Sequence, residues 1–204
     1  QLVPREWCIV RRILDNRPHI VLPDGGLSIH SFGYAENLAH AILLAIDQPE
    51  RSKGKIYHCG DERPLTLRQV VDAIADHMGH RWEVINMPWE LATPAKPLLM
   101  QPQTSHRFVD IGRLKADLGY SDAVKPEEAL ARTADWLCQH RPEPGGLEEQ
   151  VLQDPFDYTS EDALIERWQR FLSEWRDVDW PELPGVGMAY SGPGGRPRSQ
   201  KEFQ

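Results

Sequence analysis

The stretch from Ile20 to Ile46 reads IVLPDGGLSIHSFGYAENLAHAILLAI, and it decides the fold. An apolar run, 20–22, meets the turn residues Pro-Asp-Gly-Gly at 23–26, and an alternating apolar and polar run, 27–32, follows. Glycine supplies the positive φ that tight turns require, so this pattern predicts a β-hairpin. Beyond Gly33, apolar residues recur at helical spacing and predict an amphipathic helix with the stripe Leu38, Ala41, Ile42 and Ala45.

Strands and helices continue to alternate on both sides of this stretch, which is typical of an α/β protein. Further strands are predicted at 55–59 and 81–87, and a short helix with a loop between 88 and 104. Thr66 and Gln69 have the spacing of a capping box, and Asp110 can cap a later helix. The predicted helices cover 6–14, 34–46, 67–78, 111–118, 126–140 and 160–176, the last capped by Thr159 or Ser160.

The composition changes at residues 141–146, which read RPEPGG. We therefore expect three parts: a main domain over 1–140, a linker with an acidic amphipathic helix over 141–180, and a disordered tail over 181–204. The helix carries the apolar stripe Leu164, Trp168, Phe171, Leu172 and Trp175. Such a stripe must be covered, either by the chain's own core or by a partner chain.

Charge and cysteine content limit the classes of function. The 204 residues carry a net charge of -8, most of it after residue 140, which argues against nucleic acid or an anionic membrane as a partner. No apolar run approaches the roughly 18 residues of a membrane span, and the start does not resemble a signal peptide. Three cysteines (Cys8, Cys59 and Cys138) cannot all pair, so we expect reduced thiols and a cytoplasmic location.

Several motifs in collinear order carry a resemblance to a known family. These motifs are LPDGG at 22–26, HSFGYAENLA at 30–39, GKIYHCG at 54–60, RFVD at 107–110, LKADLGY at 114–120, EEAL at 127–130 and TADW at 133–136. With them, the chain from about Trp7 to Leu137 resembles the C-terminal half of extended short-chain dehydrogenases/reductases, the NAD-dependent epimerase/dehydratase family. The resemblance implies an α/β, Rossmann-like fold, with a substrate-binding subdomain and the late strands of the sheet.

The same resemblance implies where a substrate would bind. His30, Ser31 and Phe32 lie on the strand that would face the substrate cleft, and Arg107 matches an arginine that faces a substrate phosphate. His30 stands where the family often has arginine, and a neutral histidine is a weaker anion ligand. Two simpler interpretations remain open: His30 as an ordinary half-buried sheet residue, and Arg107 as a surface arginine paired with Asp110.

Two parts of the family's machinery are missing from the sequence. No glycine-rich strand–turn–helix motif is available to hold a dinucleotide pyrophosphate. The catalytic Tyr-x-x-x-Lys is also absent, because no tyrosine has a lysine four residues later. The resemblance thus implies NAD or NADP in the complete protein, but none bound by this chain's own motifs. Since the chain begins with Gln1, we expect a fragment or a processed product.

The sequence therefore favours the substrate-binding C-terminal region of an NAD(P)-dependent epimerase, dehydratase or reductase, with no catalytic residue of its own. The expected partners are a small-molecule substrate (a sugar nucleotide or another carbinol or carbonyl compound), the missing N-terminal half or a partner chain, and a second copy in a homodimer. The alternative is a truncated, non-catalytic relative that acts as a binding or protein-interaction module through the 160–176 helix.

Other kinds of site have little support. His58 and Cys59 are neighbours on a predicted strand, so their side chains would point to opposite faces and could not form a dyad. His77 and His80 are close in sequence, but no third ligand completes a zinc set. The sequence also lacks the Gly-x-Ser-x-Gly motif of serine hydrolases.

Overall fold

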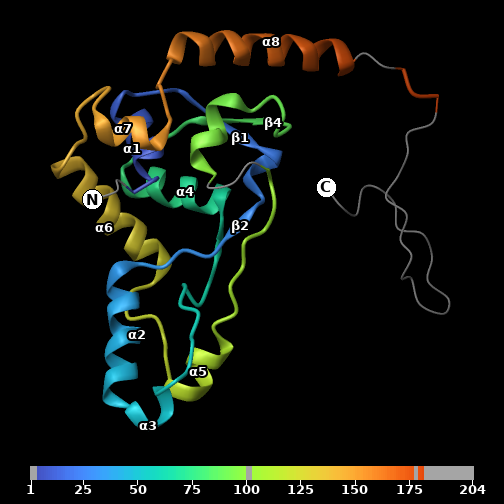
Figure 1. Cartoon of the computed structure of the whole chain (residues 1–204). Coiled ribbons are helices and arrows are strands. Elements are labelled where there is room, and N and C mark those ends of the chain that lie inside the picture. The colour runs from blue at the N-terminus through green and yellow to red at the C-terminus, as the bar shows by residue number, and fades with distance from the viewer. Residues whose placement is uncertain (1–3, 100–102, 177–178, 182–204) are drawn as a thin grey trace. The chain divides into compact units, whose positions relative to one another are not determined.

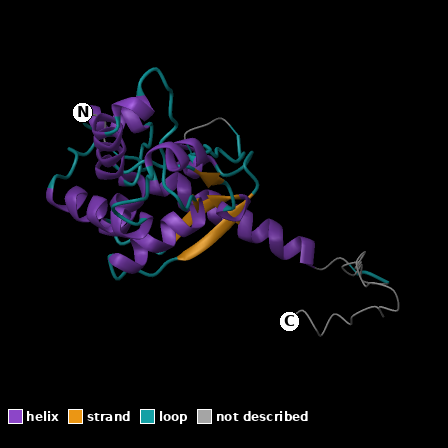
Figure 2. Cartoon of the chain, turned by 90° about the horizontal axis from the view of Figure 1, so that it is seen from below, coloured by secondary structure: helices purple, strands orange, loops and turns teal. Residues whose placement is uncertain are grey.

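The computed structural model of the chain describes residues 4–99, 103–176 and 179–181 (Figure 1). It is an α/β structure in which helices predominate, as the secondary-structure view shows (Figure 2). The elements in chain order are α1 (Trp7–Leu14), β1 (His19–Pro23), the 3-10 turn η1 (Asp24–Gly26), β2 (Ile29–His30), α2 (Ala35–Asp47), α3 (Pro49–Ser52), β3 (Leu65–Thr66), α4 (Leu67–His77), β4 (Glu83–Met87), the 3-10 helix η2 (Thr93–Leu98), α5 (Gly112–Leu118), α6 (Pro126–Gln139), α7 (Leu147–Leu152) and α8 (Tyr158–Arg176).

The chain divides into two compact units, residues 1–162 and 163–204. The first unit contains every strand given above and all helices up to the start of α8. Within the second unit, the rings of Trp168 and Phe171 stack with their centroids 5.5 Å apart, and Trp175 lies next to Phe171. The helix predicted at 160–176 is therefore present, whereas residues 182–204 of the predicted disordered tail lie outside the described residues.

The predicted β-hairpin is wrong, although the predicted turn exists. β1 pairs in parallel with β4, from His19 opposite Glu83 to Pro23 opposite Met87. β2 instead pairs antiparallel with β3, so the runs on either side of the turn enter different sheets. The turn glycines Gly25 and Gly26 both have φ near 69°, a conformation in which glycine is favoured. The turn follows from its local residues, whereas the partners of the two strands are set by long-range packing.

The strand predicted at 55–59 is also absent. Residues 55–60 form neither helix nor strand, and they pair with no strand among the described residues. Tyr57 and Cys59 pack against a buried cluster of Ala41 and residues of α5, while Ile56, which points away, is 81% exposed. The side chains alternate as in a strand, but a strand is defined by its hydrogen-bonded neighbour, and none is present.

The main core lies where α1, α4 and α6 pack together beside β1. Its fully buried members include Trp7, Val10, Ile20, Ile74 and Leu137. The buried positions of α4 and α6 follow the helical spacing expected from the sequence. Burial of this face stabilises the three helices far more than their intrinsic propensity does.

The ends of the helices follow from local chemistry. Thr66 Oγ1 accepts a hydrogen bond from the Gln69 N–H, and the Gln69 side chain accepts one from the Thr66 N–H, which confirms the predicted capping box. Gly119 ends α5 with a φ of 70°. The cap of α8 is Asp157, not Thr159 or Ser160, because its carboxylate accepts from the N–H and hydroxyl of Ser160.

Candidate functional site

The structure brings the four predicted site residues into one neighbourhood. β2 ends at His30, and Arg107 forms a parallel bridge beside it although 77 residues separate them. The main chains of the two segments are hydrogen-bonded to each other. The Ser31 N–H donates to the Arg107 carbonyl at 2.8 Å, and the Arg107 N–H donates to the Ile29 carbonyl at 2.8 Å. The carboxyl end of β2 thus holds His30, Ser31, Phe32 and Arg107 together.

His30 is a neutral, buried side chain in this neighbourhood. It is 7% exposed, and its Nε2 lies 3.3 Å from the Ser28 hydroxyl. Burial lowers the pKa of His30, and the positive charge of Arg107 lowers it further. His30 can therefore exchange hydrogen bonds near neutral pH, but it supplies no charge for an anion. The expectation of a half-buried sheet residue understates its burial, since the cross-strand neighbour Leu65 and the Phe32 ring lie beside it.

Ser31 and Arg107 differ from His30 in exposure. The Ser31 hydroxyl accepts a hydrogen bond from the Val109 N–H at 3.1 Å, so it fixes the segment that carries Arg107. Arg107 itself is exposed and is the cation of the group. The guanidinium of Arg107 lies near enough to His30 for its charge to act on that imidazole, and an exposed guanidinium can hold an anionic oxygen.

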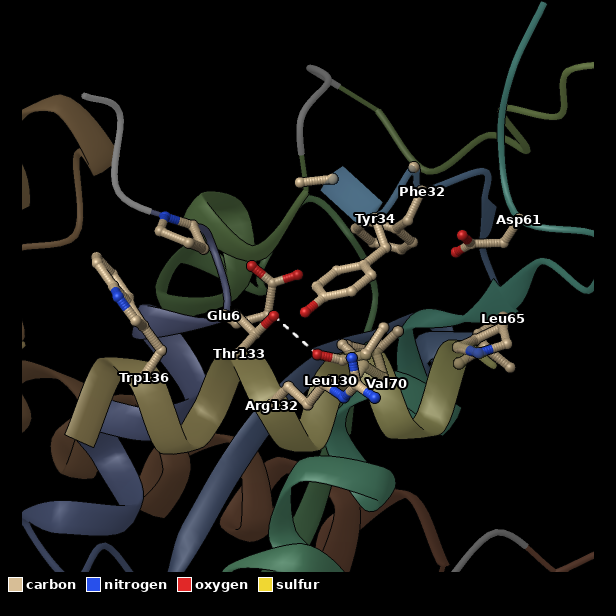
Figure 3. Close-up of a pocket in the computed structure, with 15 residues that line it drawn as sticks. Glu6, Phe32, Tyr34, Asp61, Leu65, Val70, Leu130, Arg132, Thr133 and Trp136 are labelled. Atoms are coloured by element: carbon tan, nitrogen blue, oxygen red, sulfur yellow. Dashed lines mark hydrogen bonds between the residues drawn. The ribbon is translucent and has the colours of Figure 1, made fainter. Parts of the chain in front are cut away.

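A pocket of about 490 Å³ is lined in part by Phe32 (Figure 3). Its walls come from the start of α1, from residues 32–35 and from α6. Phe32 lines it, whereas His30, Ser31 and Arg107 do not. The side chains labelled in Figure 3 are Glu6, Phe32, Tyr34, Asp61, Leu65, Val70, Leu130, Arg132, Thr133 and Trp136.

Tyr34 projects into this pocket between two carboxyl groups, Asp61 on one side and Glu6 on the other (Figure 3). Asp61 is 8% exposed, and its Oδ1 has no hydrogen-bond partner. Burial, together with the nearby charge of Asp122, raises the pKa of Asp61 to about 6. Burial also raises the pKa of Glu6. The pocket therefore combines an apolar lining with two carboxyl groups that take up protons more readily than usual.

The sequence alone did not reveal this pocket. The available signal was the position of Asp61, which follows the strand-like run 55–59 at the end where open α/β sheets place their ligand sites. Tyr34 and Arg132 carried no such signal, because they reach the pocket only when α2 and α6 come together.

The remaining candidates have separate environments. His77 contacts Asp135 at 2.8 Å and His80 contacts the Arg17 carbonyl at 3.0 Å, so the two histidines do not share a partner. Across the residues that the structure describes, no group of three His, Cys, Asp or Glu side chains could hold a metal ion. Burial raises the pKa of Cys59, which disfavours a reactive thiolate. None of the described helices is long and apolar enough to cross a membrane.

Comparison with known proteins gives relatives but no family model, since no model matches the chain. The chain is 25% identical over 159 residues to the uncharacterized protein YbjS of Escherichia coli, which covers 67% of this chain and 47% of that protein. It is 33% identical over 75 residues to UDP-D-apiose/UDP-D-xylose synthase 2 of Arabidopsis thaliana, covering 36% of this chain and 19% of that one. The chain thus spans less than half the length of these relatives.

Comparison with solved structures identifies the fold. A UDP-glucuronic acid 4-epimerase from Bacillus cereus, solved with NAD, matches 68% of this chain and 40% of its own with a TM-score of 0.52 at 14% identity. At that identity the match concerns the fold alone. This chain has the α/β fold of the C-terminal part of the NAD-dependent epimerases and dehydratases, the extended short-chain dehydrogenases/reductases.

Proposed function

We propose that this chain is the substrate-binding C-terminal region of an NAD(P)-dependent epimerase, dehydratase or reductase. The observation that carries the proposal is the extent of the structural match, 68% of this chain against 40% of the epimerase. One part of an epimerase fold is thus represented, and the residues that the resemblance assigns to substrate lie together in it. The cofactor would bind to polypeptide outside these residues.

The substrate that fits this site best is a sugar nucleotide. Arg107 would contact a phosphate oxygen, and His30 and Ser31 would lie beside it. Since His30 is neutral, the anion would depend on Arg107 for charge. Two similar proteins support a sugar nucleotide, because one is a UDP-D-apiose/UDP-D-xylose synthase and the other is a UDP-glucuronic acid 4-epimerase.

The chain would not catalyse the reaction alone. Hydride transfer in such enzymes needs a tyrosine activated by a lysine, and no tyrosine here has a lysine four residues later. Tyr34 projects into the pocket, but the residue four positions on is Leu38. The proposal therefore assigns substrate contact to this chain and the proton and hydride steps to a segment outside it.

The test is calorimetric titration of UDP-glucose and UDP-glucuronic acid into the chain produced together with the polypeptide encoded directly upstream. We expect Arg107→Ala to raise Kd roughly 10- to 100-fold, the loss of one charge-assisted hydrogen bond. Arg81→Ala is the matched control, because Arg81 is an exposed arginine whose partner is Asp76. Equal affinities for the two variants would exclude the Arg107 contact, and turnover by the chain alone would exclude its catalytic incompleteness.

A second candidate function is an interaction module without catalysis. The aromatic side chains Trp168, Phe171 and Trp175 favour it, because they form a continuous row along α8. A native start codon at the first residue would support the module, whereas an in-frame glycine-rich strand–turn–helix directly upstream would support the enzyme region.

A further inference from the structure

The pocket in Figure 3 contains a buried carboxylate that lacks a hydrogen-bond donor. Asp61 is 8% exposed, and its Oδ1 has no partner among the described residues. The nearby charge that acts on it, that of Asp122, is also negative. By contrast, the buried Asp154 pairs with the Arg12 guanidinium at 2.6 Å. A buried carboxylate oxygen without a donor costs free energy, which a donor supplied by a ligand would recover.

The charge balance of the pocket favours a cation as that donor. Glu6 contributes a second carboxyl group to the same lining as Asp61. Arg132 also lines the pocket, but its guanidinium is paired with Glu36 at 2.9 Å and with Glu128 at 2.7 Å. The positive charge of Arg132 is therefore offset by its own partners, and the two carboxyl groups leave the pocket with a negative balance.

The rest of the lining is aromatic and aliphatic. Phe32, Tyr34 and Trp136 supply three rings, and Val70 and Leu130 contribute aliphatic wall (Figure 3). Aromatic faces attract cations as well as apolar groups. The volume of about 490 Å³ lies in the range of small-molecule sites, which is roughly 300 to 1,000 Å³. A ligand that matches this lining has an apolar body and one positively charged donor.

We propose that this pocket is a binding site for a small organic amine with an apolar body. The ammonium group donates to Asp61 Oδ1, and the apolar body lies against the rings of Phe32 and Tyr34. The residues assigned above to the phosphate contact do not line the pocket. The inference therefore does not rest on the proposed function.

The protonation of Asp61 agrees with this role. Burial raises its pKa to about 6, so the carboxylate is ionised at pH 8 although it lies in an apolar place. Ionised groups that are held at a cost in stability are common at binding sites. A bound ammonium group would lower that cost, because it supplies both a donor and the opposite charge.

Calorimetric titration of the chain at pH 8 tests the site with four probes. Phenethylamine has both the apolar body and the positive charge. Phenethyl alcohol is its neutral equivalent, phenylpropionate has the opposite charge, and methylamine lacks the body. We expect phenethylamine to bind at least about tenfold more tightly than each of the other three. In NMR spectra it should shift the amide resonances of Gly33, Tyr34 and Asp61.

A pair of variants tests the role of the carboxylate. Asp61→Asn should raise the Kd of phenethylamine at least about tenfold. Asp47→Asn is the matched control, because it makes the same change at an exposed aspartate outside the pocket and should leave that Kd unchanged. Asp61→Asn removes a buried charge that opposes folding, so weaker binding by this variant would not reflect a failure to fold.

Several results would overturn the proposal. These are no binding of phenethylamine, equal affinity for phenethylamine and phenethyl alcohol, and equal effects of the two asparagine variants. Loss of amine binding when the chain is combined with the polypeptide encoded directly upstream would also overturn it, because that polypeptide would then fill the pocket. Amine binding without sugar-nucleotide binding would refute the proposed function alone.

Discussion

Asn37 connects the start of α2 to the segment before α6 with both functions of its amide. Its Nδ2 donates to the Val124 carbonyl and its Oδ1 accepts from the Val124 N–H, each at 2.9 Å, and the residue is buried. The structure gives the reason for the amide, since aspartate could not donate to the carbonyl.

Asn37→Asp is therefore expected to destabilise the chain by about 2–4 kcal/mol. The substitution leaves the Val124 carbonyl unpaired and places a buried carboxylate near Asp61. Urea denaturation would measure the change in the free energy of unfolding. Gln69→Glu is the control, because this exposed side chain keeps an acceptor for the Thr66 N–H. Similar stability of the two variants would contradict the role of the amide.

Asp61 makes the stability of the chain depend on pH. Its pKa is raised from 3.8 to about 6 in the folded state, so folding binds a proton between these values. The penalty for ionising it is absent below pH 3.8, grows as the pH rises, and is complete above pH 6.

Asp61→Asn is expected to remove that penalty. It should stabilise the chain by about 2 kcal/mol at pH 8, with a gain that shrinks toward pH 4. Unfolding curves at several pH values would measure it. Asp117→Asn should behave in the opposite sense, because hydrogen bonding to Lys55 lowers the pKa of Asp117. A gain for Asp61→Asn that does not change with pH would contradict the assignment.

Buried ion pairs hold helix α1 against the segment 145–161. Arg12 contacts Asp154 at 2.6 Å and Glu161 at 3.4 Å, and all three side chains are 2% exposed. Trp7 and Arg11 also bond to Glu149. The sequence predicted the helix α1, but its helical spacing did not reveal that Arg12 is buried.

Asp154→Ala is expected to cost on the order of 3 kcal/mol, because it leaves a buried guanidinium without its main partner. Asp72→Ala, which removes an exposed pair with Arg68, should cost less than about 0.5 kcal/mol. Thermal unfolding of both variants would compare them. A small effect at Asp154 would mean that water or Glu161 compensates for the missing carboxylate.

Stability is unevenly distributed within residues 1–162. The core of α1, α4, α6 and β1 is closely packed, whereas segment 55–60 lacks strand pairing among the described residues. Local unfolding around this segment should therefore require the least free energy.

Limited trypsin digestion of the chain alone is expected to cut first after Lys53 or Lys55. Both residues are exposed and adjoin the unpaired segment. Cleavage after Arg12, which is buried in a helix, should require global unfolding. Mass spectrometry of the early fragments would identify the sites. Early cleavage elsewhere in the described part of residues 4–162 would contradict this distribution of stability.

Local sequence patterns determined most of the helices, the capping box of α4, the turn at 24–26 and the fold class, because these depend on residues a few positions apart. The resemblance to the epimerase/dehydratase family also predicted a shared substrate site for His30, Ser31, Phe32 and Arg107. Only the tertiary structure decided that β1 pairs with β4, that Arg12 is buried, and that Tyr34 and Asp61 share a pocket with α6. These features join residues about 60 to 140 positions apart, and such contacts depend on how whole elements pack.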